Sequence, residues 1–142
     1  AGAQLVSETI PKLVNGEITP IKQNEDEATF ASNIKREQEL IDWKMNGEDI
    51  YNHIRGLHPW PVAYTLLNGK VLKVWWGEKV NIDKQGQAGE VIELQKDGFI
   101  VKTGNNTAIK ITDLQLAGKK RMTAEEMLRG TAIISTGMKL GE

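Results

Sequence analysis

The spacing of hydrophobic residues changes along the chain from a helical pattern to an alternating one. The helical part comes first, and its hydrophobic positions share one helix face: Leu5, Val6, Ile10, Leu13 and Val14. Gly16 follows at a place where glycine commonly ends a helix. This pattern predicts an amphipathic helix over residues 1–16, with no local segment to cover its apolar face.

The next segment, residues 17–36, shows no periodicity. It is polar, contains Pro20 and carries the acidic run 25–27, so it is predicted to be an extended linker. Helical spacing then predicts a short helix over residues 32–41. A second helix is predicted from Gly47 to Arg55, where Asn46 is expected to cap it and Gly56 to end it in the left-handed conformation.

After residue 61 the period of the hydrophobic pattern becomes two, as in strands. Asn68-Gly69 predicts a type I′ hairpin turn, which needs positive φ at both central residues. Thr123 and Glu126 form a capping box for a short helix to Arg129, and residues 132–134 are expected to form a strand or tail. Tight turns join the five expected strands, which favours a closed or nearly closed antiparallel barrel: 62–67, 71–80, 90–94, 99–103 and 107–116.

The sequence His58-Pro59-Trp60-Pro61 stands between the second helix and the first strand. Each proline lacks an amide hydrogen and restricts the residue before it, so the segment is predicted to be a stiff corner. Trp60 is interpreted as a packing residue, with stacking on a ligand as the alternative. His58 has no nucleophile or carboxylate placed to act with it, and is interpreted as a turn or surface residue.

Composition excludes several kinds of site. The 142 residues include no cysteine and only two histidines, so disulfides and thiolate ligands are absent and no metal site is expected. No apolar run approaches the ~20 residues of a membrane helix, and the expected location is the cytoplasm. The net charge of −1 is uneven, because residues 1–49 hold 10 of the 19 acidic residues but only 5 of the 18 basic ones. The remainder is mildly basic, which is compatible with a polyanionic partner.

Several short motifs, in this order, resemble the C-terminal part of the methionyl-tRNA formyltransferase family. The resemblance runs through Ile41-Asp42-Trp43, Pro59-Trp60-Pro61, Leu66 to Lys70, Val74-Trp75 and Ala117 to Met122. It departs from the family at three positions, where His58 replaces a common Asn, Lys35 a common Ser, and Leu40 a common polar residue.

The resemblance implies a domain division and a reaction. Residues 1–16 would be the last helix of a catalytic domain, 17–36 a linker, and 37–142 a five-stranded barrel like those that bind oligonucleotides. Enzymes of this family move a formyl group from 10-formyltetrahydrofolate to methionyl initiator tRNA, using Asn, His and Asp of an N-terminal domain outside this sequence. No catalytic residue is carried over, and these residues alone are expected to be inactive and to bind no cofactor.

The expected partners are initiator methionyl-tRNA and the N-terminal catalytic domain of the same chain, with the protein a monomer. Adjacent strand residues face opposite ways, so one of Trp75 and Trp76 is expected in the core, and the resemblance implies that it is Trp75. Trp76 would then lie partly buried against a neighbouring loop or, alternatively, stack on a base. Basic side chains would bind the phosphates of the tRNA backbone, whatever the base sequence. The densest basic cluster provides the first three candidates, and the linker exit and the residue before the proline-rich corner provide the weaker ones: Lys119, Lys120, Arg121, Arg55, Lys35 and Arg36.

The sequence also allows two other interpretations of the function. The same module could follow a formyltransferase domain that acts on folate or on a nucleotide sugar, and the basic cluster would then be incidental. Alternatively, the chain could be a free-standing barrel that binds nucleic acid or protein.

Overall fold

The protein is described here from a computed structural model, which covers residues 2–130 and 133–142. It contains two compact units, residues 1–33 and residues 34–142. Ala132, part of the predicted strand or tail at 132–134, lies outside the described residues.

The first unit contains helix α1 (Gly2–Val14) and the short 3-10 helix η1 (Glu25–Glu27). The predicted N-terminal helix is therefore confirmed, and so is its stop. Gly16 has φ of +73°, its N–H donates to the Leu13 carbonyl at 3.1 Å, and the Glu17 N–H donates to the Lys12 carbonyl at 2.9 Å. This pair of hydrogen bonds is a Schellman motif. The apolar residues of α1 are exposed.

The second unit is built on an antiparallel sheet with the strand order β1-β2-β5-β4-β3, and the short β6 pairs with β5. The turn between β1 and β2 has φ of +51° at Asn68 and +71° at Gly69, as the type I′ prediction requires. The mainly β class and the five main antiparallel strands are confirmed. The strands are β1 (Tyr64–Leu67), β2 (Lys70–Val80), β3 (Val91–Gln95), β4 (Gly98–Lys102), β5 (Ala108–Leu116) and β6 (Met122–Thr123).

Of the closed or nearly closed barrel that the sequence favours, the closed form is excluded by the structure. Strands β1 and β3 stand at the two ends of the strand order and do not pair with each other within the described chain. The C-terminal segment contacts both instead. The Gly141 N–H donates to the Leu66 carbonyl of β1 at 2.9 Å, and the Val91 N–H of β3 donates to the Met138 carbonyl at 2.8 Å. Edge backbone groups are thus satisfied by the tail and not by strand pairing.

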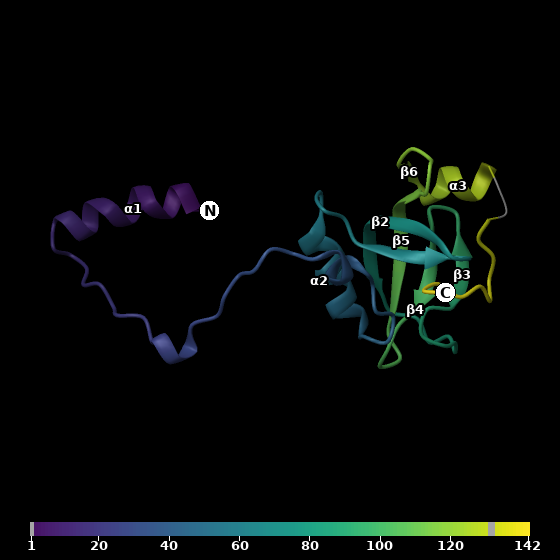
Figure 1. The fold of residues 1–142 in the computed structure, drawn as a ribbon, viewed down its shortest axis with the longest axis horizontal. Helices are drawn as coiled ribbons and strands as arrows, with labels where there is room; N and C mark the ends of the chain where they lie inside the picture. The colour runs from purple at the N-terminus through teal and green to yellow at the C-terminus, as the bar shows by residue number, and fades with distance from the viewer. Residues whose placement is uncertain (1, 131–132) are drawn as a thin grey trace. The chain divides into compact units, whose positions relative to one another are not determined.

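Helix α2 (Gly47–Leu57) packs on β2, and α3 (Ala124–Gly130) packs elsewhere on the sheet, beside β6 (Figure 1). Asn46 caps α2 as predicted, because its side chain accepts the Asp49 N–H at 2.9 Å. The predicted stop at Gly56 is wrong, because the helix continues to Leu57 and Gly56 does not have a positive φ. The predicted helix over 32–41 is also wrong, since that stretch forms only the short 3-10 helix η2 (Arg36–Glu39). The capping box before α3 is present, with the Thr123 N–H donating to Glu126 Oε2 at 2.9 Å.

The core fills the space between α2, α3 and the sheet. Trp43, which precedes α2, is only 5% exposed, and its Nε1–H donates to Thr65 Oγ1 of β1 at 2.9 Å. Gly104 lies against the segment that precedes α2, so close that a Cβ added to Gly104 would overlap the Lys44 carbonyl. Across the described ranges, no helix is long and apolar enough to cross a membrane.

Candidate nucleic-acid interface

The residues between β5 and β6, 117–121, form what we call the basic loop. It contains Lys119, Lys120 and Arg121, all of them exposed. Gly118 has φ of +73°, and the Lys119 N–H donates back to the Leu116 carbonyl at 3.0 Å, so the chain leaves β5 through a tight turn. Neither lysine side chain has an ion-pair partner among residues 2–130 and 133–142. The loop therefore presents two free ammonium groups to solvent.

Arg121 differs from its two neighbours because it is held by β5. Its Nε donates to both Asp113 carboxylate oxygens at 3.0 Å, and its Nη2 donates to Asp113 Oδ2 at 2.6 Å. The pKa of Arg121 is raised, chiefly by these hydrogen bonds, which stabilise the charged guanidinium. The guanidinium also lies over the Trp75 ring, 4.4 Å from its centroid.

A second set of contacts holds the backbone of the basic loop. Gln115 lies two residues after Asp113 on β5, so both side chains leave the same face of the strand. Gln115 Nε2 donates to the Lys119 carbonyl at 2.9 Å, and Trp75 Nε1–H donates to Gln115 Oε1 at 3.2 Å. The loop is thus attached to β2 and β5 at two points.

Four aromatic rings form a row between α2 and β2. His58 lies edge-on to Trp75 and Trp76, with ring centroids 6.1 and 5.5 Å away, and Trp76 lies edge-on to Tyr51 at 6.3 Å. The expectation that Trp75 is a core residue is wrong, because both tryptophans are half-buried. The register of β2 against β5 shifts on each side of Trp76, and this bulge breaks the alternation of facing.

The proline-rich corner places its two functional candidates differently. His58 takes part in the aromatic row and has no carboxylate or nucleophile bonded to it within the described residues. Trp60 is 83% exposed, so the interpretation that it packs within this unit is wrong. The corner itself is fixed to the fold, since Val62 is buried and its N–H donates to the Leu57 carbonyl at 3.0 Å.

The remaining predicted cations do not join the basic loop in a network of described contacts. Arg55 is exposed in the last turn of α2, where it donates to Asn52 Oδ1 at 3.0 Å. Arg36, in the 3-10 helix η2 (Arg36–Glu39), forms an ion pair with the buried Glu39 and lies over the Tyr64 ring. Lys35 is exposed at the start of η2. Arg36 is therefore tied to the fold, whereas Lys35 and Arg55 have no ion-pair partner among residues 2–130 and 133–142.

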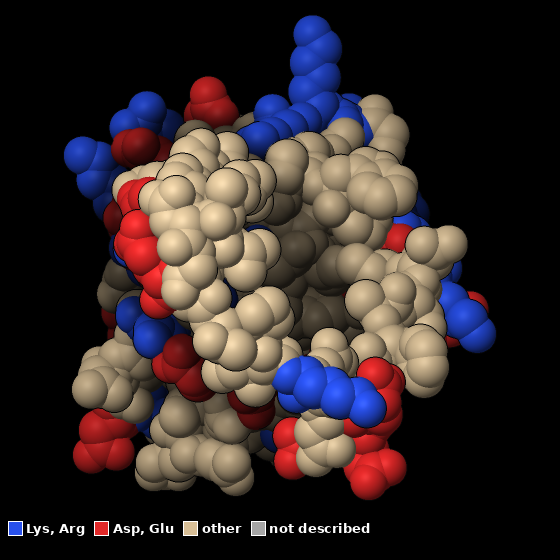
Figure 2. Space-filling model, turned by 90° about the vertical axis from the view of Figure 1, so that its left-hand side faces the viewer, with Lys and Arg blue, Asp and Glu red and all other residues tan. Residues whose placement is uncertain are grey.

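Charge alone does not outline an interface. Figure 2 shows basic side chains in several separate groups, with acidic side chains among them. A polyanion attracted only by net charge would find no single basic patch on this face. A polyanion is better served by a local group of free cations, and the basic loop is the local group that the sequence indicates.

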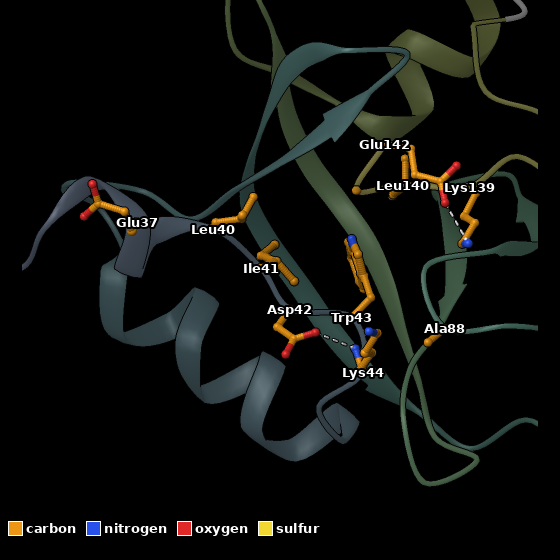
Figure 3. A pocket seen from close by; sticks show the side chains of 11 residues that line it. Glu37, Leu40, Ile41, Asp42, Trp43, Lys44, Ala88, Lys139, Leu140 and Glu142 are labelled. Atoms are coloured by element: carbon orange, nitrogen blue, oxygen red, sulfur yellow. Dashed lines mark hydrogen bonds and ion pairs between the residues drawn. The ribbon is translucent and has the colours of Figure 1, made fainter.

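A hollow of about 490 Å³ lies beside Trp43, between the segment 40–44 and residues 139–142 (Figure 3). Lys139 and Glu142 form an ion pair at 2.7 Å on its rim. No buried side-chain nitrogen or oxygen among the described residues lacks a hydrogen-bond partner, so no unsatisfied buried polar group marks the hollow as a ligand site. Residues 2–130 and 133–142 also contain no group of three or more His, Asp or Glu arranged to hold a metal ion.

Comparison with known proteins places this geometry in a family. The family described as "Formyl transferase, C-terminal domain" matches residues 33–132, which is most of the second unit. The chain belongs to the formyl transferase family.

Curated relatives of this chain agree closely with it in sequence. It is 64% identical over its full length to a methionyl-tRNA formyltransferase of Geobacillus sp. and 61% identical to one of Bacillus thuringiensis. In both cases it spans 45% of the relative's length. The fold resembles that of HypX from Aquifex aeolicus, with a TM-score of 0.61 at 18% identity, covering 90% of this chain and 23% of that one.

Sequence reasoning missed the residues that support the basic loop. Asp113 and Gln115 drew no attention because each is an ordinary polar residue on a strand. One signal was present: both stand at alternate positions near the end of a strand that leads directly into the basic cluster. That spacing places them on the face next to the returning chain.

Proposed function

We propose that this chain is the C-terminal part of a methionyl-tRNA formyltransferase, and that residues 37–142 help to hold the initiator tRNA. Identity of 64% over the full chain to such an enzyme supports the assignment. The observation that carries the tRNA role is the pair of exposed lysines in the basic loop, which have no ion-pair partner in the described part of the chain. The chain spans less than half of those relatives, so the formyl transfer itself is assigned to a part of the protein outside these residues.

The basic loop suits a phosphate backbone and not a particular base. Lysine ammonium groups are compact charges that bind phosphates in many orientations, and such contacts release counterions from the nucleic acid. Lys119 and Lys120 are adjacent, so they can reach neighbouring phosphates of one strand. Arg55 and Lys35 are proposed as weaker contacts, because each is exposed but lies outside the basic loop.

The rest of the chain is proposed to connect this module with the catalytic domain. Residues 1–16 would be the last helix of that domain, and 17–36 the linker. The exposed apolar stripe of α1 supports this, since a helix with an apolar face normally buries it. The catalytic domain would bind 10-formyltetrahydrofolate, and the proposed substrate places the enzyme in the cytoplasm.

The test is the salt dependence of initiator-tRNA binding by the full-length protein. The variant is Lys119→Ala/Lys120→Ala, and the matched control is Lys44→Ala/Lys96→Ala, which removes two exposed lysines elsewhere on the unit. The slope of log K against log salt is negative. If both loop lysines contact phosphates, the slope of the Lys119→Ala/Lys120→Ala variant is smaller in magnitude by about 1.5, at ~0.7–0.9 per contact. The control keeps the slope of the unmodified protein. Equal slopes in both variants would refute the proposed tRNA contact.

A further inference from the structure

Arg121 makes the contacts of an anchored side chain. Three hydrogen bonds join it to Asp113, and one face of its guanidinium is covered by the Trp75 ring. Asp113 also offsets its positive charge locally. A phosphate approaching Arg121 would meet the Asp113 carboxylate as well, whereas one approaching Lys119 or Lys120 meets an unpaired cation.

The contacts of Arg121 and Gln115 bracket the two lysines along the chain. Gln115 holds the Lys119 carbonyl, and Asp113 holds the Arg121 side chain two residues later. Trp75 supports both attachments, because it donates to Gln115 and stacks under Arg121. The backbone that carries Lys119 and Lys120 is therefore fixed at each end to strands of the sheet.

We propose that Arg121 is a positioning residue and not a phosphate contact. Together with Asp113, Gln115 and Trp75 it holds the basic loop in the shape that presents Lys119 and Lys120 to an RNA backbone. This inference rests on the proposed function. Fixing the loop before binding lowers the loss of freedom on association, so a protein without the anchors binds the same phosphates more weakly.

The two roles of Arg121 predict different salt dependence. A phosphate contact contributes to the slope of log K against log salt, whereas an anchor changes affinity and leaves the number of contacts the same. Gln115 gives an independent test, because it is uncharged and cannot change the slope by losing a phosphate contact. Substitution of Gln115 also leaves Arg121 and Asp113 in place, so it remains informative if an Arg121 variant folds poorly.

The experiment compares tRNA binding by the full-length protein with that of Arg121→Gln, Gln115→Leu and Lys119→Ala. We expect Arg121→Gln and Gln115→Leu each to weaken binding by roughly 2- to 10-fold, the size associated with ordering about one side chain. Both should keep the unmodified slope, while Lys119→Ala should lower it by about 0.7–0.9. Amide hydrogen exchange in residues 117–121 should rise in the first two variants, with the midpoint of thermal unfolding unchanged.

Arg121→Lys separates charge from geometry. Lysine keeps the positive charge but cannot make the bidentate hydrogen bonds to Asp113 or stack in the same way on the Trp75 ring. An anchor predicts that Arg121→Lys binds as weakly as Arg121→Gln.

The inference is overturned if Arg121→Gln lowers the slope by about one unit, or if Gln115→Leu binds like the unmodified protein. A weak, salt-independent interaction of the unmodified protein would overturn the proposed function as well. That outcome is distinct, because it is seen before any variant is made.

Discussion

The hydrogen bond between Trp43 and Thr65 offers a quantitative test of how the second unit is assembled. Trp43 Nε1–H donates to Thr65 Oγ1 at 2.9 Å, and Thr65 is 0% exposed. Trp43→Phe leaves that hydroxyl buried without its donor, at a cost of about 1–3 kcal/mol. It also removes part of a buried ring, which costs about 1 kcal/mol more at ~0.8 kcal/mol for each buried methylene-sized group. The free energy of unfolding should therefore fall by about 2–4 kcal/mol.

A double-mutant cycle isolates the hydrogen bond from the packing. Thr65→Val keeps the side-chain shape but leaves the indole N–H unpaired, so it should cost about 1–3 kcal/mol. The double variant has neither unpaired group, and it should be more stable than the sum of the single changes predicts by about 1 kcal/mol or more.

The assay is urea unfolding of the chain, followed by circular dichroism so that the readout does not depend on the mutated tryptophan. Slopes against urea should agree among the four proteins, so that midpoints report stability. If the two substitutions add to within about 0.3 kcal/mol, the two side chains are not coupled. The segment before α2 would then be held in the core by some other contact.

Three further predictions concern the surface and the turns. The hydrogen bond from Lys110 at 2.7 Å lowers the pKa of Asp97 below its ordinary value of 3.8, so this carboxylate contributes stability above that pH and loses it as pH falls through the folded-state pKa. Asp97→Asn should flatten the stability profile below about pH 4 in acid unfolding, and an unaltered profile would exclude the ion pair as a contributor. Trp60→Leu should leave the free energy of unfolding within about 0.5 kcal/mol of the original, because the ring is 83% exposed, and a loss above 1 kcal/mol would indicate packing. Gly104→Ala should cost about 1–3 kcal/mol, since its Cβ overlaps the Lys44 carbonyl, and unchanged thermal unfolding would contradict that close approach.

Local signals in the sequence were sufficient for most of the elements. The Asn68-Gly69 turn, the Asn46 cap and the Thr123 capping box are each decided by residues within four positions of one another, and all three occur as predicted. Alternating hydrophobic positions placed the five main strands within a few residues of their observed bounds. Signals of this kind act through neighbouring backbone groups, so the rest of the fold has little influence on them.

The errors arose where distant segments meet. Whether a sheet closes depends on the register and tilt of all its strands, and here the C-terminal segment occupies both edges. The bulge at Trp76 likewise reflects the pairing of β2 with β5, and it changes which way Trp75 faces.

The candidate interface shows the same limit. A run of three basic residues is visible in the sequence, but the pairing of Arg121 with Asp113 appears only once β5 and the returning chain lie side by side. Sequence reasoning treated the three cations as equivalent. The structure separates two free lysines from one anchored arginine.

Chemical footprinting of lysines on the full-length protein tests directly whether the basic loop contacts the tRNA. An amine-reactive reagent modifies exposed lysines, and mass spectrometry reports each position with and without methionyl initiator tRNA. If the basic loop binds the RNA backbone, tRNA protects Lys119 and Lys120, while Lys96, in the turn between β3 and β4, reacts equally in both states. Equal modification of Lys119 and Lys120 under conditions where tRNA is bound would show that the RNA lies elsewhere on the protein.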